Sequence, residues 1–404
     1  MRRGRLRGGR AAADPRPASH RGPRRARTDP MTSRPLSAVV LAAGEGTRMR
    51  SSRPKPLHML AGRAMLLYVL DSLADCAVGR VVVVVGHGAE RVTKKLQDDE
   101  PDLVLEFVEQ HVQRGTGDAV AVGLTGFPED VADDDLDDVL VLPGDTPLLR
   151  SSTIAALVDA HRSSGAACTI LTGIVDDPSG YGRILRHKDG RVMRIVEDAD
   201  ATPEEALINE MNTSIYCFRR SVLAPALRRL EPSNAQGEYY LTDVVSVLHE
   251  AGYRVDTVVA ADPGEAEGVN DRVQLAAAEA ELRRRTNEGW LRRGVTMVDP
   301  RETYIDSTVQ LANDVTLFPG AILQGRTVVG KGTEIGPGTR LVDCVVGADV
   351  SIERTTARDA EIGDGAVVGP YASLSPGASV PAGTVTGPFY TAPDPGDGAD
   401  STEG

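Results

Sequence analysis

A six-residue repeat near the C-terminal end constrains the fold of this 404-residue chain more than any other feature. Aliphatic residues recur at the same place in successive hexapeptides: Leu311, Leu317, Leu323, Val329, Ile335, Leu341, then, after a five-residue step, Val346 and Ile352, and further on Ile362, Val368, Leu374 and Val380. An α-helix is excluded, because six is not a multiple of 3.6 and glycine and proline are frequent. The repeat predicts a short left-handed parallel β-helix, in which each aliphatic residue points inward and stacks on the next coil.

The chain before this repeat, from residue 37 to about residue 259, alternates short apolar runs with amphipathic stretches. Its first apolar run, residues 38–42, suits a strand buried on both faces and ends abruptly at Gly44 and Gly46. This alternation predicts an α/β domain with a doubly wound sheet. Since the chain is too long for one ordinary core, we expect two domains with flanking tails.

The glycine turn after the first strand suits an anion. Glycines let backbone N–H groups approach a phosphate, and Arg48, Arg53 and Lys55 add cations nearby in the sequence. Taken alone, such a turn is more often structural than nucleotide-binding. It is not a dinucleotide fingerprint, because Met49 stands where the third glycine is required, and it is not a Walker loop, which needs Gly-Lys-Ser/Thr.

The charge of the chain argues against a nucleic-acid partner. The formal net charge is −13, but residues 1–30 hold ten arginines and two aspartates, so they carry +8 and the remainder −21. An acidic body repels nucleic acid, and an anionic substrate needs clustered cations and a divalent metal. We expect residues 1–34 to be a disordered basic extension. A nucleic-acid arm, a targeting leader and an upstream translation start before Met31 are the alternatives, and the last agrees best with the rest of the chain.

Cysteine usage and hydropathy indicate a cytoplasmic protein without a membrane partner. Cys76, Cys168, Cys217 and Cys344 are widely spaced and form no C-x-x-C pair, which suits reduced thiols. No apolar run approaches the length of a membrane span.

The sequence around the first glycine turn resembles a known signature. L-A-A-G-x-G-T-R-M (41–49) followed by P-K (54–55) is the pattern of sugar-1-phosphate nucleotidylyltransferases. The wider stretch PKPLHMLAGRAML most resembles bacterial N-acetylglucosamine-1-phosphate uridylyltransferases, the first half of a bifunctional enzyme of cell-wall precursor synthesis. The resemblance implies transfer of a uridylyl group from UTP to N-acetylglucosamine-1-phosphate, with release of pyrophosphate.

The resemblance assigns the nucleotide to two glycine turns. The second turn, residues 115–117, opens a helix whose N-terminus attracts acceptors. By itself it would be interpreted as a plain turn with a threonine cap. The implied nucleotide contacts are Leu41, Ala42, Ala43, Gly44, Lys55, Gln110, Gly115 and Thr116, of which Gln110, Gly115 and Thr116 would read the uracil base.

A metal site is expected after the apolar strand 139–142. Asp145 follows this strand at the edge where open α/β sheets bind ligands, and a carboxylate there can hold Mg²⁺. The resemblance adds Asn270 as the second ligand, although an asparagine just before the predicted helix 272–293 could also be its cap. The acidic run 133–138 is interpreted as a solvated loop, because closely spaced like charges seldom bind a metal without partners.

The segment after the next strand, residues 166–175, is expected to project over the sheet as a sugar-binding flap. Residues 188–190 look like the turn of a β-hairpin. By resemblance, the sugar contacts are Gly144, Gly182, Glu197, Asn212, Tyr240 and Thr242. One departure from the family pattern is Ser214, which stands where N-T-G usually has its glycine.

The implied catalytic residues are Arg48, Lys55 and Asp145. A sugar phosphate is already ionised at neutral pH, so in-line attack on the α-phosphorus needs alignment and charge neutralisation rather than a base. Arg48 is assigned to the triphosphate and Lys55 to the phosphates and the developing charge, while Asp145 and Asn270 hold Mg²⁺.

The second activity of the bifunctional family is predicted to be absent. Acetyl transfer to glucosamine-1-phosphate uses a histidine base and basic residues in later coils. Here no histidine follows His249, and Ser373 and Ser375 stand where the family has arginines. The acetyltransferase half is therefore interpreted as truncated. Hexapeptide-repeat transferases commonly trimerise, so the resemblance implies a homotrimer through the β-helix.

The predicted fold is α/β, with a doubly wound Rossmann-like nucleotidyltransferase domain (35–268), a linker helix (269–298), a truncated left-handed β-helix (299–382) and a disordered tail (383–404). Two alternatives stay open for the function. Another sugar-1-phosphate nucleotidylyltransferase would use GTP, dTTP or ATP. A noncatalytic regulatory or assembly subunit would share the fold, but the intact catalytic and metal-binding residues argue against it.

Overall fold

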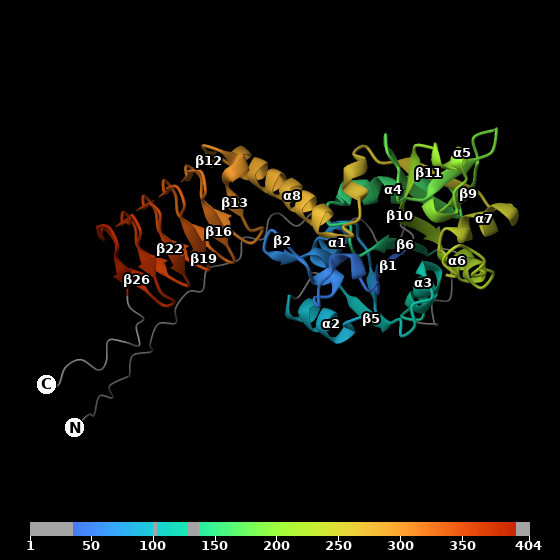
Figure 1. The fold of residues 1–404 in the computed structure, drawn as a ribbon, viewed down its shortest axis with the longest axis horizontal. Helices are drawn as coiled ribbons and strands as arrows, with labels where there is room; N and C mark the ends of the chain where they lie inside the picture. The colour runs from blue at the N-terminus through green and yellow to red at the C-terminus, as the bar shows by residue number, and fades with distance from the viewer. Residues whose placement is uncertain (1–34, 100–102, 128–136, 393–404) are drawn as a thin grey trace, which may run out of the picture. The chain divides into compact units, whose positions relative to one another are not determined.

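The computed structural model describes residues 35–99, 103–127 and 137–392 (Figure 1). The predicted basic extension, most of the acidic run and residues 393–404 of the predicted tail lie outside the described residues. Within the described part, an α/β domain is followed by a long helix and a β-helix, as the two sequence patterns predict.

The α/β domain is built on a nine-stranded mixed sheet. Its main path runs β11-β7-β10-β6-β1-β4-β5, and β8 and β9 lie off this path. Strand β1 pairs in parallel with β4 and β6, whereas β10 is antiparallel to both β6 and β7. The strands are β1 (Leu36–Ala42), β4 (Arg80–Val85), β5 (Leu105–Glu109), β6 (Asp138–Pro143), β7 (Cys168–Ile174), β8 (Arg183–Arg186), β9 (Val192–Val196), β10 (Glu210–Arg219) and β11 (Val255–Val259).

Helices cover both faces of this sheet. Successive residues of a strand point to opposite sides, so an apolar strand such as β1 presents an apolar surface on each face. Val39 of β1 joins a core with α3, α6 and α7. Its neighbours Ala38 and Val40 join a second core with α1, α2 and α4. The helices are α1 (Met65–Ala74), α2 (Ala89–Asp98), α3 (Thr116–Leu124), α4 (Ser151–Ser164), α5 (Pro203–Ala206), α6 (Arg220–Leu227) and α7 (Asp243–Glu250).

Two short irregular segments follow β1. The 3-10 helices η1 (Thr47–Met49) and η2 (Lys55–Leu57) are followed by a small hairpin of β2 (Met59–Leu60) and β3 (Arg63–Ala64). The predicted hairpin is present: β8 and β9 are antiparallel, the turn between them contains residues 188–190, and β8 also pairs with β10 of the main sheet.

The interpretation of the acidic run as a solvated loop is wrong for its last two residues. Asp138 is the first residue of β6 and is 0% exposed, and Asp137 is also buried. Arg162 Nε donates to Asp138 at 2.9 Å, and Arg220 Nη1 donates to Asp137 at 3.3 Å. These arginines belong to α4 and α6, so the partners that make burial tolerable are distant in the sequence.

The helix α8 (Arg272–Arg292) leads into three parallel sheets that form the β-helix. The first sheet holds β12 (Thr296–Met297), β15 (Thr316–Leu317), β18 (Glu334–Ile335), β21 (Ser351–Ile352) and β24 (Val367–Val368). The second holds β13 (Tyr304–Ile305), β16 (Ile322–Gln324), β19 (Arg340–Val342), β22 (Thr356–Arg358), β25 (Ser373–Leu374) and β27 (Thr391–Ala392). The third holds β14 (Gln310–Leu311), β17 (Val328–Val329), β20 (Val345–Val346), β23 (Glu361–Ile362) and β26 (Ser379–Val380).

The aliphatic residues of the repeat form the core of this solenoid. Leu317, Ile335 and Ile352 lie on neighbouring strands of one sheet and are at most 1% exposed. The prediction that disorder begins at residue 383 is wrong. Residues 383–392 contain β27, which pairs with β25.

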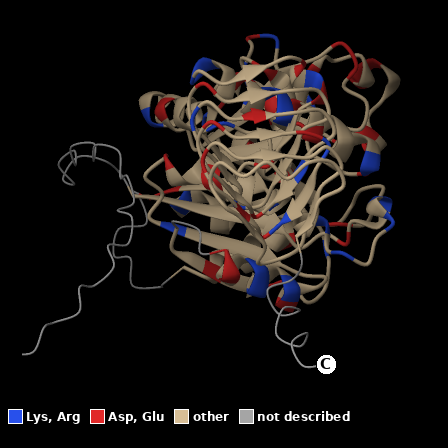
Figure 2. Cartoon of the chain, turned by 90° about the vertical axis from the view of Figure 1, so that its left-hand side faces the viewer, with Lys and Arg blue, Asp and Glu red and all other residues tan. Residues whose placement is uncertain are grey.

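Charges are mixed over the β-helix end of the molecule. Figure 2 views the chain from this side, and basic and acidic residues are interspersed in that view. Among the described residues, no helix combines the length and the apolar character that a membrane span requires.

Candidate active site

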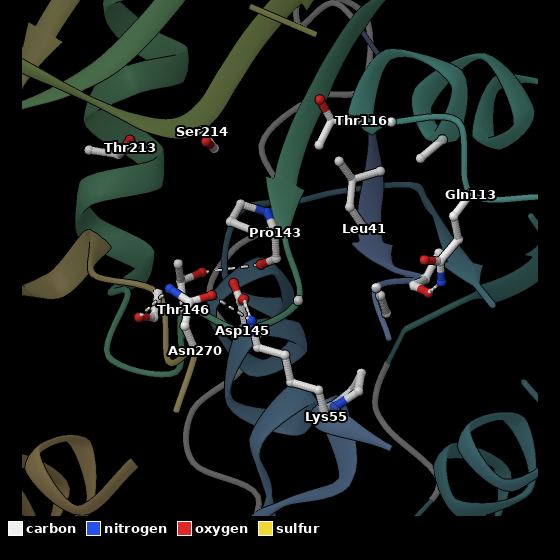
Figure 3. Close-up of a pocket in the computed structure, with 18 of the residues that line it drawn as sticks. Leu41, Lys55, Gln113, Thr116, Pro143, Asp145, Thr146, Thr213, Ser214 and Asn270 are labelled. Atoms are coloured by element: carbon white, nitrogen blue, oxygen red, sulfur yellow. Dashed lines mark hydrogen bonds and ion pairs between the residues drawn. The ribbon is translucent and has the colours of Figure 1, made fainter. Parts of the chain in front are cut away.

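A cavity of about 460 Å³ opens at the carboxyl ends of β1 and β6 (Figure 3). Ligands of open α/β sheets bind at this edge. Twelve of the residues predicted for the site line the cavity: Leu41, Ala42, Ala43, Gly44, Arg48, Lys55, Gln110, Gly115, Thr116, Gly144, Asp145 and Asn270. The motifs at the ends of distant strands are therefore brought to one place.

The first glycine turn lets the Lys55 side chain pack against the backbone of Gly46. Gly46 has φ 65°, and a Cβ added there would lie 2.7 Å from Lys55 Cβ. Any side chain at this position would therefore displace Lys55. Gly44 has no neighbour within 4 Å of such a Cβ, so its backbone borders open cavity that a phosphate can enter.

Lys55, Asp145 and Asn270 point toward one another in the cavity (Figure 3). The Lys55 ammonium forms an ion pair with the Asp145 carboxylate and donates to Asn270 Oδ1 at 2.8 Å. Both members of the ion pair are largely buried, with side chains 13% and 21% exposed. The side-chain oxygens of Asp145 and Asn270 thus converge on the position of the Lys55 ammonium group.

The segment before α8 holds Asn270 in place. The backbone N–H of Val269 donates to the Asp145 carbonyl at 2.8 Å, and the N–H of Asn270 donates to Gln274 Oε1 at 2.7 Å. The helix cap is Asp271, whose carboxylate accepts from the N–H groups of Val273 and Gln274. The alternative that Asn270 caps the helix is therefore wrong, and its side-chain oxygen faces the cavity.

The other end of the cavity is formed by Gln110 and the start of α3. Gln110 is 5% exposed, and its Nε2 donates to Asp118 Oδ2 at 2.7 Å and to the Gly115 carbonyl at 3.3 Å. These bonds fix which way the amide points. Thr116 Oγ1 accepts from the N–H of Leu241 at 3.0 Å, which ties the helix start to the segment before α7.

The predicted sugar residues other than Gly144 gather around Glu197. Thr242 Oγ1 donates to Glu197 Oε1 at 2.9 Å. A Cβ at Gly182 would lie 3.4 Å from Glu197 Oε2 and 3.5 Å from Asn212 Cβ, so these three residues are close neighbours. Burial raises the pKa of Glu197, and nearby carboxylates add to this effect.

Tyr240 is buried in the same region. Burial raises the pKa of its phenol to about 12. Its hydroxyl is buried and has no hydrogen-bond partner among the described residues. An unpaired buried hydroxyl is costly, so this group suits a polar ligand.

Sequence reasoning missed Gln113. Its Nε2 donates to the Ala43 carbonyl at 2.7 Å across the cavity edge, joining the two glycine turns. The only available signal was its place between Gln110 and Gly115. Tyr181, Thr146 and Glu238 also line the cavity and were not predicted.

The fold and the site define a nucleotidyltransferase. A parallel strand ends in a glycine turn, and a cation and a carboxylate meet at the edge where ligands bind. Residues 38–251 match a family model described as "MobA-like NTP transferase domain".

Comparison with curated proteins identifies the family. The bifunctional protein GlmU of Heliobacterium modesticaldum is 44% identical over 353 residues, which cover 87% of this chain and 75% of the relative. The GlmU protein of Rhodococcus jostii is 47% identical over 358 residues, covering 87% and 71%, and that of Thermobifida fusca is 47% identical over 332 residues, covering 82% and 68%. The chain belongs to the bifunctional GlmU family, and it is a sugar-1-phosphate nucleotidyltransferase. The resemblance found in the sequence is thereby confirmed.

Proposed function

We propose that this enzyme transfers a uridylyl group from UTP to N-acetylglucosamine-1-phosphate, giving UDP-N-acetylglucosamine and pyrophosphate. The observation that carries the proposal is the convergence of Lys55, Asp145 and Asn270 beside the glycine turn. A cation between a carboxylate and an amide oxygen, next to a glycine turn with open space at Gly44, is what transfer between two phosphates requires.

The residues of this site fit Mg²⁺. A magnesium ion is commonly held by one or two protein oxygens together with phosphates and water, and Asp145 and Asn270 supply such a pair. No cluster of three or more acidic, histidine or cysteine ligands occurs in the described part of the chain, so substrate oxygens would complete the coordination. When bound, Mg²⁺ would neutralise phosphate charge and align the two substrates.

The protein groups act by binding and orientation. Arg48 is exposed at the cavity edge and is assigned to the triphosphate, while Lys55 is assigned to the charge that develops during transfer. The attacking sugar phosphate is already ionised, so no general base is needed. Gln110, held by Asp118, is assigned to uracil, and Glu197, Asn212 and Thr242 are assigned to the sugar hydroxyls.

The proposal also covers the role of the β-helix, the oligomeric state and the location of the protein in the cell. We propose that the stretch described here does not transfer acetyl groups, because Ser373 and Ser375 replace basic residues and no histidine follows His249. We also propose a homotrimer through the β-helix and a cytoplasmic location, the latter supported by four free cysteines. Acetyl-CoA-dependent acetylation of glucosamine-1-phosphate by the pure protein would contradict the first of these.

One experiment tests the substrates. The pure protein is incubated with Mg²⁺ and each of UTP, GTP, dTTP and ATP, paired in turn with several sugar-1-phosphates, while pyrophosphate release is followed. We expect the highest kcat/KM with UTP and N-acetylglucosamine-1-phosphate, and no turnover after chelation of the metal. Faster turnover with another pair would replace the proposed substrates, and silence with every pair would favour the noncatalytic alternative.

A further inference from the structure

Strand β10 is irregular at the residues that border the cavity. Asn212 pairs with Thr172 of β7 and Ile215 pairs with Leu171, so the pairing skips two residues of β10. One of these, Ser214, has φ 62°, which lies in the left-handed region that disfavours residues with a side chain. Strained residues of this kind concentrate at functional sites.

Ser214 is also the exposed residue of this irregular segment. Asn212, Thr213 and Ile215 are at most 3% exposed, whereas Ser214 is exposed and lines the cavity together with Lys55 (Figure 3). The Thr213 hydroxyl is used internally, because it donates to the Leu171 carbonyl at 2.7 Å.

A hydrogen-bonded chain leads from the sugar region to Ser214. The Ser214 N–H donates to Asn212 Oδ1 at 3.1 Å, and Asn212 Nδ2 donates to the Tyr216 hydroxyl oxygen at 2.8 Å. Tyr216 is 1% exposed, and burial raises its pKa well above the usual range, so the phenol keeps its proton.

The Asn212 amide is engaged at both ends, because its Oδ1 accepts from the Ser214 N–H and its Nδ2 donates to the Tyr216 oxygen. It therefore holds the backbone of Ser214, and the serine hydroxyl on that backbone has one proton to donate and two lone pairs with which to accept. Ser214 is the member of the chain that faces the cavity.

We propose that Ser214 is a substrate-contacting residue, whose hydroxyl forms a hydrogen bond with a ring hydroxyl of the sugar phosphate, and that Tyr216 is its positioning residue, acting through Asn212. This inference rests on the proposed function. Glycine would suit the backbone at this position better than serine, but it would remove the hydroxyl group. The serine therefore adds a sugar contact at the expense of backbone strain.

Two substitutions separate the hydroxyl from the strain. Ser214→Ala removes the hydroxyl and keeps the left-handed backbone, whereas Ser214→Gly removes both the hydroxyl and the strain. We expect the KM for N-acetylglucosamine-1-phosphate to rise about tenfold in both variants, as the loss of one hydrogen bond requires, with the KM for UTP unchanged. The melting temperature should rise only in Ser214→Gly.

A third variant and a substrate series identify the contact. Tyr216→Phe should raise the same KM by a smaller factor, because the Ser214 hydroxyl remains but the Asn212 amide that holds the Ser214 backbone loses one of its partners. With 3-deoxy, 4-deoxy and 6-deoxy substrates, the penalty of Ser214→Ala should vanish for one analogue and persist for the other two.

The outcomes distinguish this inference from the proposed function. If the unsubstituted protein is active and both Ser214 variants keep its KM for the sugar phosphate, the inference is wrong and the proposed function stands. A penalty that persists with every deoxy analogue would also overturn the contact. If the unsubstituted protein turns over no substrate pair, the proposed function fails, and the inference fails with it.

Discussion

Lys55 forms an ion pair with Asp145 although the two residues are 90 positions apart in the sequence. Lys55 comes from η2 after the glycine turn, and Asp145 follows β6. Parallel pairing of β1 with β6 brings the carboxyl ends of these strands together. The same ammonium group donates to Asn270, so a protein cation holds both oxygens that are assigned to the metal. Lys55 would have to turn toward the phosphates when substrate and metal bind.

Replacing Lys55 should therefore slow the chemical step. We expect Lys55→Ala to lower kcat by at least about 100-fold, because a preorganised charge next to the reacting phosphates is lost. The measurement is steady-state pyrophosphate release at saturating substrates. Lys95→Ala is the matched control, since Lys95 also pairs with an aspartate, Asp99, but on the exposed face of α2. Near-normal turnover in Lys55→Ala would remove this residue from the mechanism.

The sequence indicated which residues form the site better than it indicated how they are held. Lys55, Asp145 and Asn270 each stand in a motif or at a strand end, so resemblance could select them. Their supports are different: the Val269 N–H bonds to the Asp145 carbonyl and Gln113 bonds to the Ala43 carbonyl. These bonds depend on which loops meet in space, and no local pattern encodes that.

Gly46 should matter through contact as well as through backbone conformation. We expect Gly46→Ala to lower kcat by about tenfold or more, because the new Cβ would lie 2.7 Å from Lys55 Cβ. The variant should also lose about 1 kcal/mol of unfolding free energy from the positive φ.

Gly165→Ala is the matched control for this variant. Gly165 also has positive φ, 63°, but has nothing within 4 Å of an added Cβ. It should lose similar stability, measured by chemical denaturation, and keep normal kcat. Equal loss of kcat in the two variants would show that contact with Lys55 is irrelevant.

The buried acid of β6 should contribute to stability and not to turnover. Burial alone would raise the pKa of Asp138, but hydrogen bonds from His161 and Arg162 outweigh this and lower it. We expect Asp138→Ala to reduce the unfolding free energy by about 3 kcal/mol, because it leaves a buried network without its anion. Since the folded pKa lies below its ordinary value of 3.8, the stabilisation should be present above that pH and disappear as the pH falls. Unchanged melting temperature at pH 7 would contradict this role.

The β-helix was the most predictable part of the fold, since its inward positions repeat in the sequence. The aliphatic pattern fails where a coil uses a small residue. Ala357 occupies the inward place between Leu341 and Leu374, and Ala392 does so on the last described strand. Alanine is common on surfaces as well as in cores, so its periodicity carries little signal. The end of the solenoid was consequently placed too early.

Burial of the Glu197 carboxylate, a group assigned to sugar binding, should lower the stability of the folded protein. Its folded pKa is raised above the ordinary 4.5, chiefly by burial, so the protonated carboxyl favours folding below that pH and this contribution is lost as the pH rises. Glu197→Gln keeps an oxygen acceptor for Thr242 and cannot ionise. We therefore expect a higher melting temperature than the unsubstituted protein at pH 7.5, a smaller difference at pH 4, and a KM for the sugar phosphate at least about tenfold higher.

Glu205→Gln is the opposite case, because the N–H of Thr202 lowers the pKa of Glu205, and it should lower the melting temperature at pH 7.5. Shifts of the same sign in both variants would show that burial of the Glu197 charge does not oppose folding.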